Sequence, residues 1–175
     1  MRLRPYIHAL DFDMIKEWIP DERTHALWSA NRFPYPLEEH SFAAFLSEIA
    51  VKNQDCPIVA EEESGRIVGF FCYGISSVTN EGMLKFVAVD RNLRGQGYGT
   101  AMLHLALQYA FEITNAKAVN LNVFSVNEAA KHCYCNAGLT AKSTTDGAFQ
   151  FQDEQWGRCH MAITKSQWQG RVRRA

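Results

Sequence analysis

The stretch "VDRNLRGQGYGTAML", residues 89–103, decides the fold prediction because it joins an apolar run to a run of helix-forming residues. It contains three glycines close together, Gly95, Gly97 and Gly99. A strand that ends at Val89 and a helix that begins near Gly97 would direct free N–H groups and the positive helix end at one spot. Glycine also lets the backbone approach a ligand closely. The stretch therefore predicts a phosphate-binding loop, with a ligand-free connection as the alternative.

The glycine spacing excludes two common phosphate loops. A P-loop requires G-x-x-x-x-G-K-[ST], and the chain contains no Gly-Lys pair. A dinucleotide-binding fingerprint, G-x-G-x-x-G, fails because Thr100 stands where the third glycine is needed. The run from Arg94 to Gly99, "RGQGYG", instead resembles the R/Q-x-x-G-x-G/A signature of the GCN5-related N-acetyltransferase (GNAT) superfamily.

A second block, about thirty residues further along, supports this resemblance. Asn127, Ala130, Tyr134 and Gly138 follow the family pattern N-x-x-A-x-x-x-Y-x-x-x-G-F, with leucine at 139 in place of phenylalanine. "LKFVAVD" resembles the family's central strand, and the close resemblance covers residues 83–140. The N-terminal third resembles only loosely the substrate-binding helices of the ribosomal-protein and amino-acid acetyltransferase branches.

The order of predicted elements agrees with an α+β fold of three layers, α/β/α. The resemblance implies the GNAT form of it, a mixed and mostly antiparallel central sheet flanked by helices. A single domain is expected over residues 1–170, followed by a solvated basic end at 171–175. Strands are predicted at 2–6, 57–63, 66–77, 83–89, 118–124, 139–144 and 156–164, and helices at 9–19, 21–30, 37–52, 97–114 and 127–136.

Composition narrows the class of protein. A formal charge of -1 gives no electrostatic footprint for nucleic acid, and no apolar run is long enough to span a membrane. The protein is expected to be cytoplasmic, and its oligomeric state, including a homodimer, is left open. Five cysteines without CxxC spacing and six histidines without HExxH spacing predict no metal site, and the thiols are expected to pack as small apolar groups.

The resemblance implies that acetyl-CoA is the donor. Backbone groups of Val87 and Val89 would contact the pantetheine arm, and the Val87 N–H would stabilise the oxyanion. Arg94 and the N–H groups of residues 95–99 would hold the pyrophosphate. Asn127 would bind the pantetheine amides, or cap the helix that follows it. The loop residues assigned to the donor are Gly95, Gln96, Gly97, Tyr98, Gly99 and Thr100.

The resemblance assigns Tyr134 as the general acid that protonates the leaving thiolate, with plain packing of the ring as the alternative. The general base is less clear. Met83 and Asn122 stand where relatives carry a glutamate, so water or another carboxylate such as Glu81 would take the proton.

Two histidines and the apolar residues of one helix are interpreted as structural, and one aromatic stretch is interpreted as part of the substrate site. His104 and His132 are expected to be surface or core histidines, and the apolar stripes of the helix at 97–114 to be core. The aromatic stretch from Trp18 to Phe45 is interpreted as a wall of the substrate site in preference to plain core.

The resulting prediction is an N-acetyltransferase that acts on a primary amine by direct attack in a ternary complex. The acceptor would be a small molecule, an amino acid or a peptide N-terminus. The alternative is a catalytically silent acyl-CoA-binding sensor of the same fold.

Overall fold

The computed structural model describes residues 1–173 and has a seven-stranded sheet of order β1-β2-β3-β4-β5-β7-β6. Neighbouring strands are antiparallel except for β4 and β5, which are parallel. The predicted α+β fold with a mixed, mostly antiparallel sheet is therefore confirmed. The strands are β1 (Arg2–Pro5), β2 (Cys56–Glu61), β3 (Ile67–Ile75), β4 (Glu81–Val89), β5 (Ala118–Phe124), β6 (Thr140–Phe151) and β7 (Glu154–Thr164).

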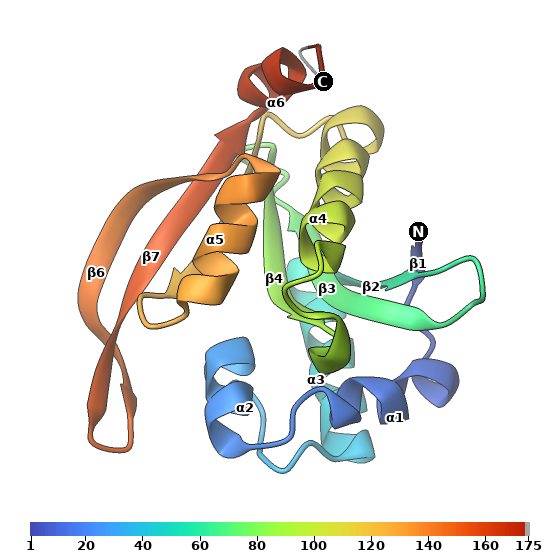
Figure 1. Ribbon diagram of the computed structural model, residues 1–175, viewed down its shortest axis with the longest axis vertical. Helices are drawn as coiled ribbons and strands as arrows, with labels where there is room; N and C mark the ends of the chain where they lie inside the picture. Colours follow the sequence, from blue (N-terminus) through green and yellow to red (C-terminus); the bar gives the residue numbers. More distant parts are fainter. Residues whose placement is uncertain (174–175) are drawn as a thin grey trace.

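Helices cover both faces of the sheet (Figure 1). One layer contains α4 and α5, and the other contains the three N-terminal helices α1, α2 and α3. The helices are α1 (His8–Glu17), α2 (Glu22–Ser29), α3 (Glu39–Asn53), α4 (Tyr98–Gln108), α5 (Glu128–Ala137) and α6 (Lys165–Val172), with short helical turns η1 (Arg91–Leu93) and η2 (Tyr109–Ile113).

Strand β3 is buried on both faces because its residues are almost all apolar. Phe71 packs with Leu107 in the core beneath α4 and α5. Phe70, its neighbour on the opposite face, packs with Phe42 in the core beneath α1 and α3. The sheet therefore lies between two hydrophobic cores. Packing in these cores fixes the strands that border the cleft described below.

Local capping signals position the helices that border this cleft. Asp21 caps α2, as predicted, and its Oδ1 accepts a hydrogen bond from the Thr24 N–H at 2.7 Å. Asn127 caps α5 in the same way, through the Ala130 N–H at 3.2 Å. Gly138 ends α5 in a left-handed conformation, with φ of 105°.

The C-terminal part of the chain differs from the sequence prediction. Strand β6 continues to Phe151, well beyond the predicted end at 144, because it pairs with β7 along a long, mostly exposed hairpin. Helix α6 was not predicted, since most of its residues are polar; Trp168 packs against Phe111. Arg171 lies in the last turn of α6 and donates to the Asn136 carbonyl at 3.2 Å. The rest of the basic end, residues 174–175, lies outside the described residues.

Two predictions about side-chain burial need correction. Most aromatics between Trp18 and Phe45 are core and not substrate-site wall, because they pack beneath α1 and α3, and only Trp28 lines the cleft. All five cysteines are free, but only Cys72 and Cys159 are buried as apolar groups. Helix α4 forms core through Met102, Leu103, Ala106 and Leu107, as predicted, whereas Ile113 near the end of the predicted helix is 71% exposed.

Candidate active site

The principal cleft lies where β4 and β5 diverge. The two strands pair only through Glu81–Met83 and Ala118–Asn120, so the backbones beyond these residues have no ladder between them. The cleft has a volume of about 850 Å³ and is lined by residues of both strands. Because Leu121 and Asn122 both line it, and adjacent strand residues face opposite ways, the cleft reaches both faces of the sheet.

One half of the cleft, the loop half, is bounded by Arg94, Gly97, Thr100 and Asn127. Gly97 is the N-cap of α4 with φ of 87° and has no side chain to cap the first amides of the helix. These N–H groups lack intrahelical partners and favour an anion. A Cβ at Gly97 would meet no atom within 4 Å, so the space beside the loop is open.

The remaining loop residues divide between the cleft and the surrounding fold. Gly95 and Gly99 line the cleft with Val87 and Val89. The Gln96 side chain donates to the Asn92 carbonyl at 2.8 Å, and the Tyr98 hydroxyl donates to Glu62 at 2.8 Å. Neither Gln96 nor Tyr98 lines the cleft, and the Gln96 N–H donates to the Leu93 carbonyl at 3.4 Å, so the structure does not bring these two predicted loop residues to the cleft.

Arg94 lies at the mouth of the loop half and is anchored by backbone oxygens. Its guanidinium donates to the Val89 carbonyl at 3.2 Å and to the Trp18 carbonyl at 3.1 Å. Desolvation by burial lowers the pKa of Arg94. The side chain thus joins β4 to the end of α1 and holds its cation beside the cleft.

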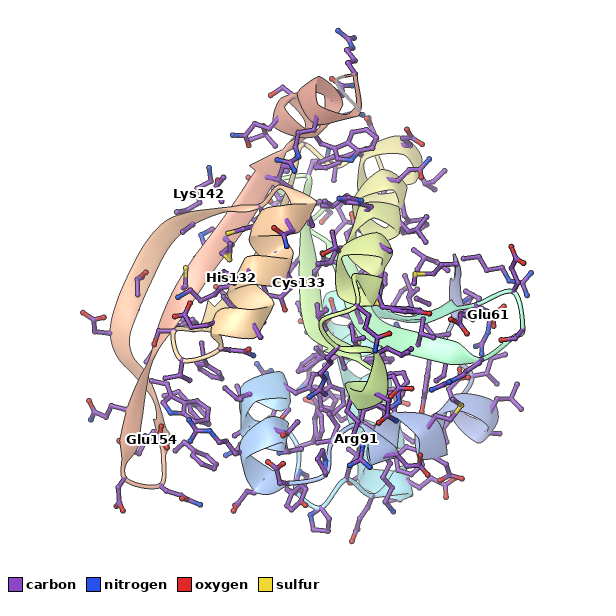
Figure 2. The ribbon with its side chains drawn as sticks, viewed as in Figure 1. Glu61, Arg91, His132, Cys133, Lys142 and Glu154 are labelled. Atoms are coloured by element: carbon purple, nitrogen blue, oxygen red, sulfur yellow. The ribbon has the colours of Figure 1, made fainter. Side chains whose placement is uncertain are left out.

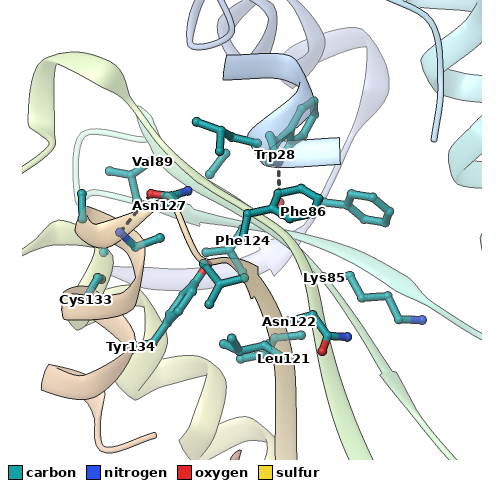
Figure 3. A pocket seen from close by; sticks show the side chains of 18 of the residues that line it. Trp28, Lys85, Phe86, Val89, Leu121, Asn122, Phe124, Asn127, Cys133 and Tyr134 are labelled. Atoms are coloured by element: carbon teal, nitrogen blue, oxygen red, sulfur yellow. Dashed lines mark hydrogen bonds between the residues drawn. The ribbon is translucent and has the colours of Figure 1, made fainter. Parts of the chain in front are cut away.

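The centre of the cleft contains a bulge in β4. Phe86 has φ of 51°, a left-handed conformation that is unfavourable for a bulky residue, and the β3–β4 register shifts at this point. Trp28 Nε1 donates to the Phe86 carbonyl at 2.7 Å (Figure 3). The Phe86 ring packs edge-on against Phe45. Contacts from α2 and α3 therefore hold the bulge.

The other half of the cleft, the α2 half, is bounded by Trp28, Arg32, Lys85, Asn122 and Arg158. Helix α2 is fixed over this half by the tip of the β6–β7 hairpin, where Figure 2 labels Glu154. Arg23 pairs with Glu154, and its guanidinium lies 5.0 Å from the centre of the Trp156 ring.

Tyr134 lies on α5 and faces the gap between the strands. Its side chain is 7% exposed, and desolvation by burial raises the pKa of the hydroxyl. The hydroxyl has no hydrogen-bond partner among residues 1–173, yet it is not sealed from solvent, because Tyr134 lines the cleft. The phenol therefore stays protonated and is available to donate a proton to a ligand.

Two neighbours of Tyr134 border the same cavity. Cys133 lies on the side of α5 that faces α4 (Figure 2), with its sulfur 3.7 Å from the Thr100 hydroxyl. Burial raises the pKa of this thiol, so it remains neutral. His132 is exposed at the rim of the cleft, and His104 is exposed on α4, as expected for surface histidines.

Glu81 lies away from the cleft, contrary to its suggested role beside the other catalytic residues. It belongs to the paired start of β4 and lines a second cavity of about 350 Å³. Asn120 donates to its carboxylate at 3.3 Å. The ladder between β4 and β5 separates Glu81 from Tyr134, since the strands open only beyond Met83.

Sequence reasoning assigned no individual role to three residues of the α2 half, Trp28, Arg32 and Arg158, although Trp28 belongs to the aromatic stretch that was interpreted as substrate-site wall. None belongs to a motif, and they come from α2, the loop after it and β7. Sequence alone gave no signal for Arg158, because its position opposite Phe124 is set by the register of β7 with β5.

Replacing Trp28 with phenylalanine is expected to lower kcat/KM about five- to tenfold, the scale of one lost hydrogen bond, because the Phe86 carbonyl loses its donor. The melting temperature should fall by only about 2–4 °C. Trp168→Phe is the matched control, since Trp168 packs on Phe111 far from the lining residues. Equal kcat/KM in the two variants would show that the bulge does not need this hydrogen bond.

Residues 1–173 contain neither a cluster of metal ligands nor a membrane-spanning helix. Within residues 1–173, no three His, Cys, Asp or Glu side chains are grouped as metal ligands would be. None of the helices in that range combines the length and apolar character needed to cross a bilayer.

Comparison with known protein families and sequences finds acetyltransferases similar to this chain. The sequence model that defines the Acetyltransferase (GNAT) family matches residues 13–138 of this chain. The chain is 28% identical over 134 residues to the 5-NmdU N-acetyltransferase of Pseudomonas phage PaMx11, a match that spans 77% of this chain and 91% of that protein. It is 30% identical over 92 residues to a mycothiol acetyltransferase of Propionibacterium freudenreichii, which spans 51% of this chain and 29% of that protein.

Solved structures share the fold. The spermidine N-acetyltransferase of Vibrio cholerae, in complex with CoA and spermine, superposes with a TM-score of 0.80 and 19% identity. The superposition covers 95% of this chain and 96% of that chain. At this identity the likeness extends to the fold alone.

Proposed function

The chain belongs to the GNAT family of acetyltransferases, and from that premise we propose that it transfers the acetyl group of acetyl-CoA directly to a primary amine. The observation that carries the proposal is the gap between β4 and β5, which joins an anion-binding loop to a protonated tyrosine. Family membership and the names of the relatives favour this enzyme over a silent acyl-CoA sensor.

The loop half suits the phosphate end of acetyl-CoA. The free amides at the start of α4, with Gly95, Gly97 and Gly99, provide N–H donors, and Arg94 provides a cation. Backbone groups of Val87 and Val89 would bind the pantetheine arm as a neighbouring strand would, apart from the Val89 carbonyl, which already accepts from Arg94. Asn127 already caps α5 through its Oδ1, which leaves its side-chain NH₂ to contact that arm.

Tyr134 is proposed as the general acid. Attack by an amine on the thioester expels a thiolate, and the Tyr134 hydroxyl would give that sulfur its proton. The raised pKa of the hydroxyl fits this role, because the group stays protonated until the sulfur becomes basic. The Val87 N–H, in the strand opposite, would stabilise the negative charge that develops on the thioester oxygen.

Water is proposed to take the proton of the attacking amine. No Asp or Glu belongs to the cleft lining within the described residues, and Glu81 belongs to a separate cavity. The amine would therefore lose its proton to solvent, or enter the cleft already neutral.

The proposed function is tested by thiol release from acetyl-CoA in the presence of a library of primary amines. Release that requires one of the amines, together with a mass increase of 42 Da on that amine, about one acetyl group, is the expected result. Binding of acetyl-CoA without amine-dependent release would support the sensor instead.

Gly97→Val is expected to weaken acetyl-CoA binding by about tenfold or more, because a side chain would occupy the open space beside the α4 amides. Gly65→Val is the matched control. Gly65 also has positive φ and no atom within 4 Å of its Cβ position, but it lies in the β2–β3 turn. Calorimetry should detect weaker binding in Gly97→Val alone. Unchanged affinity in a folded Gly97→Val protein would reject the loop as the site.

A further inference from the structure

The α2 half of the cleft carries positive charge and no carboxylate. Its charged lining residues are Arg32, Lys85 and Arg158, and none of the residues in positions 1–173 that line the cleft is Asp or Glu. Three carboxylates near the lining residues are already engaged. Asp55 accepts two hydrogen bonds from Lys85 and one from Asn53. Asp21 caps α2 through Thr24, and Glu48, whose pKa is lowered by Lys52 and to a smaller extent by Arg32, pairs with Lys52.

Two of these cations are free to bind a ligand. Lys85 Nζ lies 2.8 and 2.7 Å from the two oxygens of buried Asp55, so its charge is neutralised. Arg32 and Arg158 have no ion pair and no side-chain hydrogen bond to any residue of 1–173. Their guanidinium groups therefore retain all their donors within a cleft where substrate must enter.

The sheet register places Arg158 on the acceptor side. Arg158 on β7 lies opposite Phe124 on β5. The pair formed by Asn122 and His160 is two residues along and lies on the same face of the sheet. Phe124 packs with Ala26 of α2, so this face of the strands is the one beneath α2. Arg32 follows α2 directly, and the two arginines approach the cleft from different elements.

We propose that the acceptor amine also carries an anionic group, a carboxylate or a phosphate, which Arg32 and Arg158 bind; this rests on the proposed function. Guanidinium groups bind both anions through paired N–H bonds. A polycation would meet two unpaired like charges and no carboxylate, although the fold is shared with a spermidine N-acetyltransferase.

The anionic group would balance the charge of the two arginines, as Asp55 balances Lys85, and would orient the amine toward the gap. The arginines supply no base, so water remains the proposed acceptor of the amine proton.

The test measures thiol release with five amines, each over a range of pH so that differences in amine pKa are separated from recognition. The matched pairs are O-phosphoethanolamine with ethanolamine and β-alanine with β-alaninamide, and the fifth amine is spermidine. We expect kcat/KM to favour at least one anionic member over its neutral partner by about tenfold or more. Spermidine should be the poorest acceptor.

Variants link this preference to the arginines. Arg158→Gln and Arg32→Gln should each reduce the anionic preference, and Arg158→Glu should turn it toward spermidine. Arg173→Gln, at an exposed position after α6, is the matched control and should change nothing. Both cleft arginines are exposed, so these variants are expected to fold.

Each other outcome overturns the inference. Equal use of both members of each pair, or a preference that Arg158→Glu leaves unchanged, would reject the anionic acceptor and leave the acetyltransferase intact. Absence of thiol release with all five amines and with the wider amine library would instead reject the proposed function, and the inference with it.

Discussion

Replacing Tyr134 with phenylalanine is expected to lower turnover by about 10² or more, the scale of lost general acid catalysis. Acetyl-CoA affinity should stay within about threefold, because the buried ring is kept and only its hydroxyl is removed. Steady-state kinetics give the turnover, and calorimetry gives the affinity. The thiolate would then leave without a positioned proton donor.

Tyr73→Phe is the matched control for this variant. Tyr73 is another buried tyrosine, but its hydroxyl bonds to Thr114 and lies outside the cleft lining. It should lose some stability and keep its turnover. If Tyr134→Phe and Tyr73→Phe were equally active, Tyr134 would be a packing residue only.

The second large effect concerns pH. If water removes the proton from the amine, kcat/KM should rise about tenfold per pH unit below the pKa of the bound acceptor. A less basic amine of similar shape should move this rising limb to lower pH. Burial raises the pKa of Tyr134, so the acid stays protonated and causes no falling limb below its ordinary value of about 10.

A dedicated base would give a different profile. The limb would then stay at one pH for every amine, because it would report a group of the enzyme. Glu81→Gln is expected to leave the profile unchanged, since Glu81 lines a separate cavity. A limb that disappears in Glu81→Gln would contradict the solvent route.

Features that depend on local chemistry were predictable from the sequence. The apolar run of β4, the helix after the glycines and the caps at Asp21 and Asn127 follow from residue type and spacing alone. The cleft-lining positions of Arg94 and Tyr134 follow from the family resemblance. Their catalytic and binding roles remain predictions.

Features that depend on distant contacts were not predictable. The left-handed Phe86 depends on contacts with distant residues, among them the hydrogen bond from Trp28, 58 residues away, and the packing of its ring on Phe45. Glu81 looked available because sequence does not reveal that β4 and β5 pair until Met83. Arg158 joins the cleft only through the register of β7 with β5.

The divergence of β4 and β5 also bears on self-association. Residues 84–89 and 121–124 form two sheet edges inside the molecule, and unpaired edges ordinarily invite strands from other chains. At Met83, β4 and β5 are still paired, at the ordinary strand spacing of about 4.8 Å. A strand inserted between them and paired with both would need β4 and β5 to lie about twice that distance apart along its whole length. A polypeptide strand therefore cannot pair with both edges at once, whereas a thinner chain can enter the wedge. The fold keeps these hydrogen-bonding groups accessible without offering them as a template for aggregation.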